Sequence, residues 1–338
     1  MIRWYNVPNN NKVAAYTTIG GEKGMPSYAV EKDWWVVQTL AIIFEMKIGK
    51  HLVFKGGTSL SKAWGLIDRF SEDIDLAVSP TFFGFEDPLT KTQIKTLRKN
   101  TSSYLSTIFY PALQSKFTEK GLVDVKVEMA EVISSDQDPR IIIVHYPSVF
   151  GYQEYVQPKV QIEIGCRSLR DPFSSKSFSS FVDEYYPDAE FTQTPICIPV
   201  VNRERTFLEK IFLLHEEFQR PQDKIRVDRL SRHLYDIYQL SKTDFAEEAI
   251  GDQELYETIV NHRYKFNRIS GVDYKKHQPQ SINPIPPTEL IVAWKADYKT
   301  MQEQMIYGDS PNFETMLQTI RELRDKINRL GWEMENDF

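Results

Sequence analysis

Cysteine is scarce in this chain. Its 338 residues include only two cysteines, Cys166 and Cys197, and neither lies in a CxxC pair or at the spacing of a metal-binding cluster. The sequence therefore excludes a fold that depends on a disulfide framework. We interpret both residues as idle thiols in a reducing compartment.

Long hydrophobic runs are also missing. Apolar stretches such as TLAIIF are far shorter than the roughly 20 residues that span a bilayer. The first residues, MIRWYNVPNN, lack the apolar core of a secretory signal. We therefore expect a soluble, cytoplasmic protein without membrane contact.

Positive charge is not in excess, because the formal net charge is −6 at pH 7. This balance argues against sequence-independent coating of DNA, so any anionic substrate must be met by a local basic groove or through a metal ion. What the chain does contain is 41% apolar and 13% aromatic residues. That composition can build one large domain or two ordinary ones.

The first half of the chain mixes helix and strand patterns. Lys91 to Lys120 is helical in pattern, and VDVKVEM, IIIVHY and KVQIEIG have the lengths and alternation of strands in a mixed sheet. The other expected elements are a helix over Val30–Met46, a strand at LVF, a Gly-Gly turn, a helix over Ser59–Leu66 and a strand over Asp73–Val78.

Strand patterns almost vanish in the second half. The stretch DEYYPDAEFTQTPICIPVV, Asp183 to Val201, is the best candidate for a domain connection. Helical patterns follow over Arg203–Phe218, Arg226–Ser241, Gln253–Ile269 and Asn312–Leu330. We therefore predict an α+β protein in which residues 1–200 form a domain with a mixed sheet and residues 201–338 form a helical domain.

The strand DIDLAV carries two aspartates on one face. Alternate residues of a strand share a face, so Asp73 and Asp75 point one way while Ile74 and Leu76 point into the core. Their Cα atoms are expected roughly 6.5 Å apart, a spacing at which two carboxylates can converge on one divalent ion or bridge two. Magnesium is the expected ion. A lone DxD is more often a solvated strand face.

A glycine pair and two hydroxyls precede this strand. Gly56 and Gly57 leave backbone N–H groups open to a phosphate, and Thr58 and Ser59 add hydroxyls near a helix N-terminus. On its own this GGTS stretch would be weak support for a phosphate site.

A third metal-facing carboxylate has two candidates. In KVQIEIG, Glu163 is a polar residue on an otherwise buried strand, which fits a ligand and an exposed edge residue about equally well. Glu128, in VKVEM, is the rival.

The stretch FKGGTSLSKAWGLIDRFSEDIDLAV closely resembles the signature of the AbiEii/AbiGii-type nucleotidyltransferase toxins, in the DNA polymerase β-like nucleotidyltransferase superfamily. VEKDWWVVQTL and KVQIEIGCRS are similar to the helix and strand that flank this signature in the family. RERTFLEKIFLLHEE and RLSRHLYDIYQL resemble its remaining motifs, whose lysine and aspartate correspond to Lys210 and Asp236 here. The resemblance extends over roughly Val30 to Leu240.

Helix phasing gives both of these residues a polar side. It places Lys210 on a stripe with Arg203, Thr206 and Glu217, away from the core face. It places Asp236 on one face with Arg229, Arg232 and His233. Each stripe is also what an ordinary solvated helix face would look like.

The resemblance implies a metal-dependent nucleotidyltransferase, the toxin of a toxin–antitoxin or phage-defence system. It implies that Asp73 and Asp75, with Glu163, hold Mg²⁺ against an NTP whose phosphates lie on Gly56, Gly57 and Ser59. Lys210 would contact the triphosphate. Asp236 would either orient Lys210 or act as a base, and the sequence leaves both roles open.

RNA is the leading candidate for the acceptor, because relatives of this type include toxins that add nucleotides to tRNA 3′ ends. In support, Asn261 to His277 has five Lys/Arg and one acid, interleaved with tyrosine and phenylalanine. A solvated basic helix face is the plainer reading of that stretch. Two alternatives remain: an enzyme that nucleotidylates a protein or a small molecule such as an aminoglycoside, and an inactive nucleotide-binding module.

Overall fold

The computed structural model describes residues 2–131, 134–135, 137–151 and 157–335. The chain forms two compact units. The sheet unit contains the residues up to Trp64 together with Phe70–Val201, and the helical unit contains Gly65–Arg69 together with the residues from Asn202 on. The chain therefore leaves the sheet unit for five residues, returns to it, and leaves it again after Val201.

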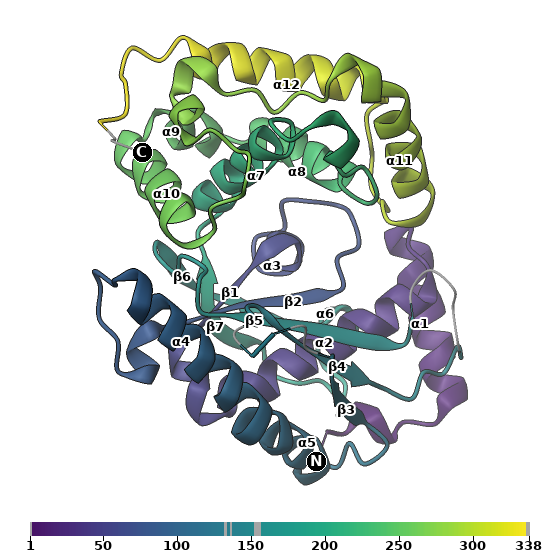
Figure 1. The fold of residues 1–338 in the computed structure, drawn as a ribbon. Helices are drawn as coiled ribbons and strands as arrows, with labels where there is room; N and C mark the ends of the chain where they lie inside the picture. The colour runs from purple at the N-terminus through teal and green to yellow at the C-terminus, as the bar shows by residue number, and fades with distance from the viewer. Residues whose placement is uncertain (1, 132–133, 136, 152–156, 336–338) are drawn as a thin grey trace. The chain divides into compact units, whose positions relative to one another are not determined.

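One mixed sheet organises the sheet unit (Figure 1). Its seven strands among the described residues lie in the order β3-β4-β5-β2-β1-β7-β6. The central strand β2 runs antiparallel to β1 and parallel to β5. The strands are β1 Leu52–Lys55, β2 Asp73–Val78, β3 Lys126–Met129, β4 Arg140–His145, β5 Lys159–Gly165, β6 Phe173–Phe178 and β7 Ile196–Val201.

Helices cover the sheet unequally. α2 packs against β2, β5 and β7, and α5 packs against α2 and β3. α3 contacts β1 and β2 and lies on the opposite side of the sheet from α2 and α5 (Figure 1). The helices of this unit are α1 Asn9–Lys23, α2 Ser27–Glu45, α3 Gly56–Lys62, α4 Lys91–Tyr104, α5 Tyr110–Glu119 and α6 Phe181–Tyr185.

Strand alternation separates the core from a polar face. Ile74 and Leu76 of β2 and Ile162 and Ile164 of β5 are almost fully buried, while the residues between them are half-buried. Since successive strand residues point to opposite faces, the apolar set packs under the helices and the polar set lies on the α3 side. The expected alternation in DIDLAV is present.

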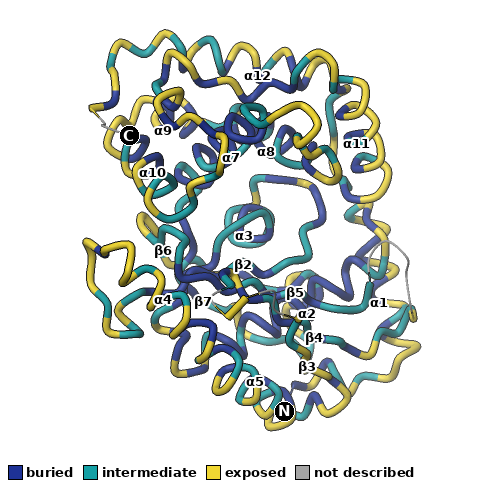
Figure 2. The backbone as a smooth tube through the Cα atoms, in the orientation of Figure 1, coloured by how far each residue is buried: buried dark blue, intermediate teal, exposed yellow. Residues whose placement is uncertain are grey.

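The helical unit is built around α7 and α8. Both helices are mostly buried (Figure 2), and α8 packs against α7, α11 and α12, while α9 and α10 pack against α7. The helices are α7 Arg203–Glu217, α8 Ser231–Ser241, α9 Phe245–Gly251, α10 Gln253–Phe266, α11 Ile291–Gln304 and α12 Phe313–Asn328. No helix in the described part of the chain is both long and apolar enough to cross a bilayer.

The predicted α+β class with a mixed sheet is confirmed, but three expected elements differ. The helix expected over Ser59–Leu66 begins at Gly56 and ends at Lys62. The stretch expected to connect two domains contains β7, which pairs with β1 and β6. The helix expected from Arg226 begins at Ser231, because Arg229 adopts a left-handed backbone with φ 57° that interrupts any helix.

Candidate active site

The two aspartates of β2 lie on the polar face of the sheet. Asp73 and Asp75 are half-buried, and the strand spans the predicted Asp73–Val78. In the parallel register of β2 with β5, Asp75 is paired with Glu163 and Asp73 with Gln161. Residues paired in this way share a sheet face, so three carboxylates lie on two neighbouring strands.

The pKa of Glu163 is affected by the two aspartates. Burial raises the pKa of Glu163, and the negative charges of Asp75 and then Asp73 raise it further. Gln161 Nε2 donates a hydrogen bond to Glu163 Oε1 at 3.0 Å, which opposes that rise. The repulsion indicates that the three carboxylates are close enough to interact electrostatically.

Glu128, the rival third carboxylate, lies elsewhere. It is on β3, three strands from β2 in the sheet order, which corresponds to roughly 14 Å at ordinary strand spacing. Its exposed side chain lies 3.3 Å from His145 Nε2 and 3.8 Å from Lys126 Nζ. Of the two candidates, only Glu163 neighbours the β2 aspartates.

Gly56 allows α3 to begin directly against Asp75. Its φ is +82°, and a Cβ placed on it would lie 2.1 Å from Asp75 Oδ2. Both conditions exclude a side chain, the first by backbone strain and the second by collision. Gly56 of the GGTS stretch and Asp75 of the DxD therefore pack directly against each other.

The two hydroxyls of the GGTS stretch are bonded within the protein. Thr58 Oγ1 donates to the carbonyl of Asp73 at 2.5 Å, and Ser59 Oγ donates to the carbonyl of Gly56 at 2.8 Å. Both residues are buried, with 1% and 0% exposure. The sequence predicted hydroxyls directed at a phosphate, whereas Thr58 here ties the start of α3 to β2.

The carboxylate set suits a hard divalent cation in its chemistry. Oxygen ligands are those that Mg²⁺ prefers, and a cation would relieve the repulsion that raises the pKa of Glu163. In the described residues, however, no three His, Cys, Asp or Glu side chains converge as a ready metal site. Asp73, Asp75 and Glu163, which share one face of two neighbouring strands, are the carboxylates whose oxygen chemistry fits such an ion.

In the helical unit, Asp236 accepts contacts from two cations. Arg69 donates from Nε to Oδ1 and from Nη2 to Oδ2, both at 2.7 Å, and Lys210 Nζ lies 2.8 Å from Oδ2. The exposed fractions of the three side chains are 3% for Arg69, 0% for Asp236 and 8% for Lys210. Helix phasing placed Lys210 on a polar stripe away from the core face, whereas Lys210 is buried and contacts Asp236.

The charges of this cluster determine its protonation. Burial would raise the pKa of Asp236, but Arg69 and Lys210 outweigh burial and hold that pKa well below its usual range. Burial lowers the pKa of Lys210, and Asp236 opposes that decrease. Burial and the neighbouring Lys210 keep the pKa of His233 well below its ordinary value, so this ring is neutral.

Sequence reasoning missed Arg69. Its partner Asp236 lies 167 residues further along the chain, and no local pattern joins them. The one feature in the sequence that could have drawn attention to Arg69 is its position four residues before Asp73, in DRFSED.

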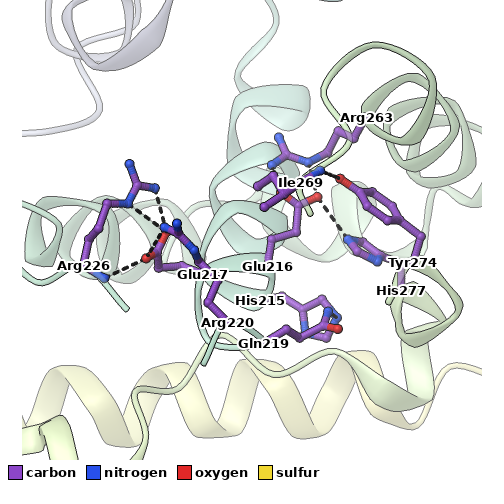
Figure 3. Close-up of polar contacts among 10 residues, drawn as sticks. All are labelled: His215, Glu216, Glu217, Gln219, Arg220, Arg226, Arg263, Ile269, Tyr274 and His277. Atoms are coloured by element: carbon purple, nitrogen blue, oxygen red, sulfur yellow. Dashed lines mark hydrogen bonds and ion pairs between the residues drawn. The ribbon is translucent and has the colours of Figure 1, made fainter. Parts of the chain in front are cut away.

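The basic stretch from Asn261 to His277 is only partly available at the surface. Arg263 is turned inward and donates from Nε to Glu216 Oε1 at 2.8 Å, and His277 contacts the same oxygen at 3.2 Å (Figure 3). Tyr274 is also buried. The exposed cations of the stretch are Lys265, Arg268, Lys275 and Lys276.

Comparisons with known proteins identify the family of the chain and a similar fold. The family model for the nucleotidyl transferase AbiEii toxin of type IV toxin–antitoxin systems matches residues 40–319. Among solved structures, the nucleotidyltransferase toxin MenT4 of Mycobacterium tuberculosis is similar in fold, with a TM-score of 0.53 and 15% identity over 96% of this chain and 90% of that one.

Weaker comparisons add nothing to this assignment. JHP933 of Helicobacter pylori has a TM-score of 0.42 and 12% identity over 86% of this chain and 90% of that one, which is too low to carry an argument. A search of curated proteins finds no match.

The family match covers well over half of the chain and confirms the resemblance seen in the motifs, and with it the nucleotidyltransferase class. The chain belongs to the AbiEii family of nucleotidyltransferase toxins of type IV toxin–antitoxin systems.

Proposed function

We propose that this nucleotidyltransferase transfers a nucleoside monophosphate from an NTP to a hydroxyl of RNA, most specifically at the 3′ end of tRNA. The observation that carries the proposal is the packing of Gly56 against Asp75, on the sheet face that also holds Asp73 and Glu163. Glycine backbone N–H groups beside three carboxyl groups on one sheet face suit phosphoryl-group chemistry, which needs contacts to phosphate and ligands for a divalent cation.

The proposed reaction forms one bond and breaks one. The acceptor oxygen attacks the α-phosphorus of the NTP, the bond from that phosphorus to the bridging oxygen breaks, and pyrophosphate leaves with the electron pair. The hydroxyl proton is released to solvent. Mg²⁺, when bound to Asp73, Asp75 and Glu163, would neutralise charge on the triphosphate. The chain's own contribution is mainly positioning and electrostatic stabilisation.

The backbone of Gly56 and Gly57 is proposed to lie against the phosphates, since glycine leaves its N–H groups open to an anion. Thr58 and Ser59 stabilise this start of α3 through their hydrogen bonds to the carbonyls of Asp73 and Gly56. Their role is then to shape the turn, and their hydroxyls do not contact the nucleotide.

We propose that both units take part in the reaction, with residues 1–200 supplying the carboxylates and residues 201–338 supplying Lys210. A charge-assisted contact from Lys210 to the triphosphate would strengthen NTP binding. For Asp236, the buried contacts with Arg69 and Lys210 support the orienting role. A carboxylate with a strongly lowered pKa is a poor base, which counts against proton abstraction.

The acceptor proposal draws on the exposed cations Lys265, Arg268, Lys275 and Lys276. The guanidinium of Arg268 lies over the ring of Tyr264, 4.8 Å from its centroid. Such groups suit a phosphate backbone with unstacked bases. The same proposal places the protein in the cytoplasm, under the control of an antitoxin partner, as a growth inhibitor or phage-defence effector.

The test uses each of the four NTPs, labelled at the α-phosphate, with the purified protein and MgCl₂. Separate reactions contain total tRNA, other RNA, a protein extract, and an aminoglycoside. We expect label in RNA, and in tRNA above other RNA. Label only in protein or in the aminoglycoside would establish the alternative nucleotidylation, and no transfer with any acceptor would leave a nucleotide-binding module.

A further inference from the structure

A buried cluster in the helical unit joins two cations to one carboxylate. Arg69 and Lys210 both contact Asp236, so the position of Lys210 depends on how this carboxylate is oriented. Removing charged groups from water is costly unless each has a partner of opposite charge. Each of the two cations is therefore held by its contact with Asp236.

Arg69 determines how Asp236 meets Lys210. Its two-pronged contact occupies both carboxylate oxygens and fixes the plane of the carboxylate. Lys210 then reaches only Oδ2, which Arg69 shares. Without Arg69, this two-pronged contact would no longer fix the plane of the Asp236 carboxylate, and Lys210 would lose its fixed partner geometry.

The segment that carries Arg69 is fixed to the helical unit by its backbone. Arg69 forms a β-bridge with Ile306, and the carbonyl of Asp68 accepts a hydrogen bond from Tyr307 N at 3.0 Å. Gly308 packs so closely that a Cβ on it would lie 2.4 Å from Asp68 Cβ. Arg69 is thus held in place independently of its side-chain contacts.

We propose that Arg69 is a positioning residue for nucleotide binding, which orients Asp236 so that Lys210 keeps the position from which it contacts the triphosphate. This inference rests on the proposed contact between Lys210 and the NTP. The plain alternative is that Arg69 and Asp236 are a structural ion pair with no influence on nucleotide affinity.

A matched pair of variants separates these readings. Arg69→Met removes the proposed positioning residue. Arg263→Met removes an equivalent buried, two-pronged contact to Glu216 in the same unit, which has no part in the proposed reaction (Figure 3). Both should lower the melting temperature. Only Arg69→Met should raise the equilibrium dissociation constant for a non-hydrolysable NTP, by about tenfold or more.

Arg69→Lys provides a second variant that keeps the charge in case Arg69→Met folds poorly. Lysine cannot reproduce the two-pronged contact, so we expect NTP affinity between those of the wild type and Arg69→Met. Wild-type NTP affinity in Arg69→Met, or equal loss of affinity in Arg69→Met and Arg263→Met, would overturn the inference.

A double-mutant cycle with Lys210→Ala tests the route of the effect. If Arg69 acts through Asp236 on Lys210, then Arg69→Met should weaken NTP binding in the wild type and have little further effect in the Lys210→Ala background. Additive losses would overturn the inference while the proposed function stands. Wild-type NTP affinity in Lys210→Ala alone would instead remove Lys210 from the proposed reaction.

Discussion

Asp75 Oδ2 lies where a side chain on Gly56 would be, because a Cβ on that glycine would come within 2.1 Å of it. The close contact joins the end of β1, the start of α3 and the middle of β2. Any side chain at position 56 must displace either the helix start or the carboxylate. The glycine pair and the paired aspartates of the sequence are therefore in direct contact and depend on each other's position.

Gly56→Ala should consequently reduce both stability and transfer. The φ of +82° costs roughly 1–2 kcal/mol for a residue with a Cβ, and displacement of Asp75 adds to that. Gly84→Ala is the matched control, because Gly84 has φ +79° but open space around its Cβ position. Thermal melts and transfer assays should show similar strain in both variants and a specific loss of transfer in Gly56→Ala. Equal activity in the two would argue against the close packing of Asp75.

Glu163→Gln should make the metal-free protein more stable near neutral pH. Burial and the charges of Asp75 and Asp73 raise the pKa of Glu163 above 4.5, so the folded state favours the protonated form. The stability from this residue is present below pH 4.5 and is lost as pH rises through the raised pKa. Melting temperatures from pH 4.5 to 7, with chelator, should fall for the wild type relative to the variant. A constant difference would show that neither burial nor the charges of the two aspartates raise the pKa of Glu163.

Asp236→Asn should be strongly destabilising. It leaves Arg69 and Lys210 buried without a counter-charge, and breaking such a contact from one side costs about 3–5 kcal/mol. Asp325→Asn is a suitable control, since Asp325 forms a partly exposed ion pair with the adjacent Arg324 on α12. Urea unfolding should show a large decrease for the first variant and little change for the second. A small decrease for Asp236→Asn would indicate that water reaches the cluster.

Charge reversal at Lys265 and Arg268 should weaken RNA binding without changing NTP affinity. Each phosphate contact that is lost should reduce the slope of log affinity against log salt by about 0.7 for single strands. Lys299→Glu, on an exposed lysine of α11, controls for net charge. Filter binding of tRNA over a range of salt concentrations measures the slope. If the control variant weakens binding equally, the stretch from Asn261 to His277 has no special role.

Sequence reasoning predicted elements with strong periodicity and missed those without it. β2 was predicted because polar and buried residues alternate over its first four residues, DIDL, before the apolar Ala77 and Val78. β6 was missed because FSSKSF has few apolar residues, as expected for a strand at the edge of the described sheet, next to β7. The start of α8 was misplaced because the left-handed backbone of Arg229 gives no signal in its residue type.

In the candidate site, too, some residues could be predicted from the sequence and others could not. Asp73, Asp75 and Glu163 could be proposed from the alternation of two strands, and their pairing in register follows from the sheet. The burial of Thr58 and Ser59 could not be foreseen, since hydroxyls near a glycine turn look the same whether they meet a ligand or the protein. Arg69 could not be assigned a partner, because contacts between residues far apart in the chain leave no local pattern.

The most direct test of the account is transfer of α-labelled NTP to tRNA by the wild type, Asp73→Asn and Asp75→Asn, each with MgCl₂ and with excess chelator. The account predicts label in tRNA only with the wild type and magnesium, and melting temperatures for both variants no lower than that of the wild type, because each variant removes a repelling charge. Transfer that persists in either variant, or without divalent metal, would contradict it. So would a loss of activity that is fully accounted for by unfolding of the variants.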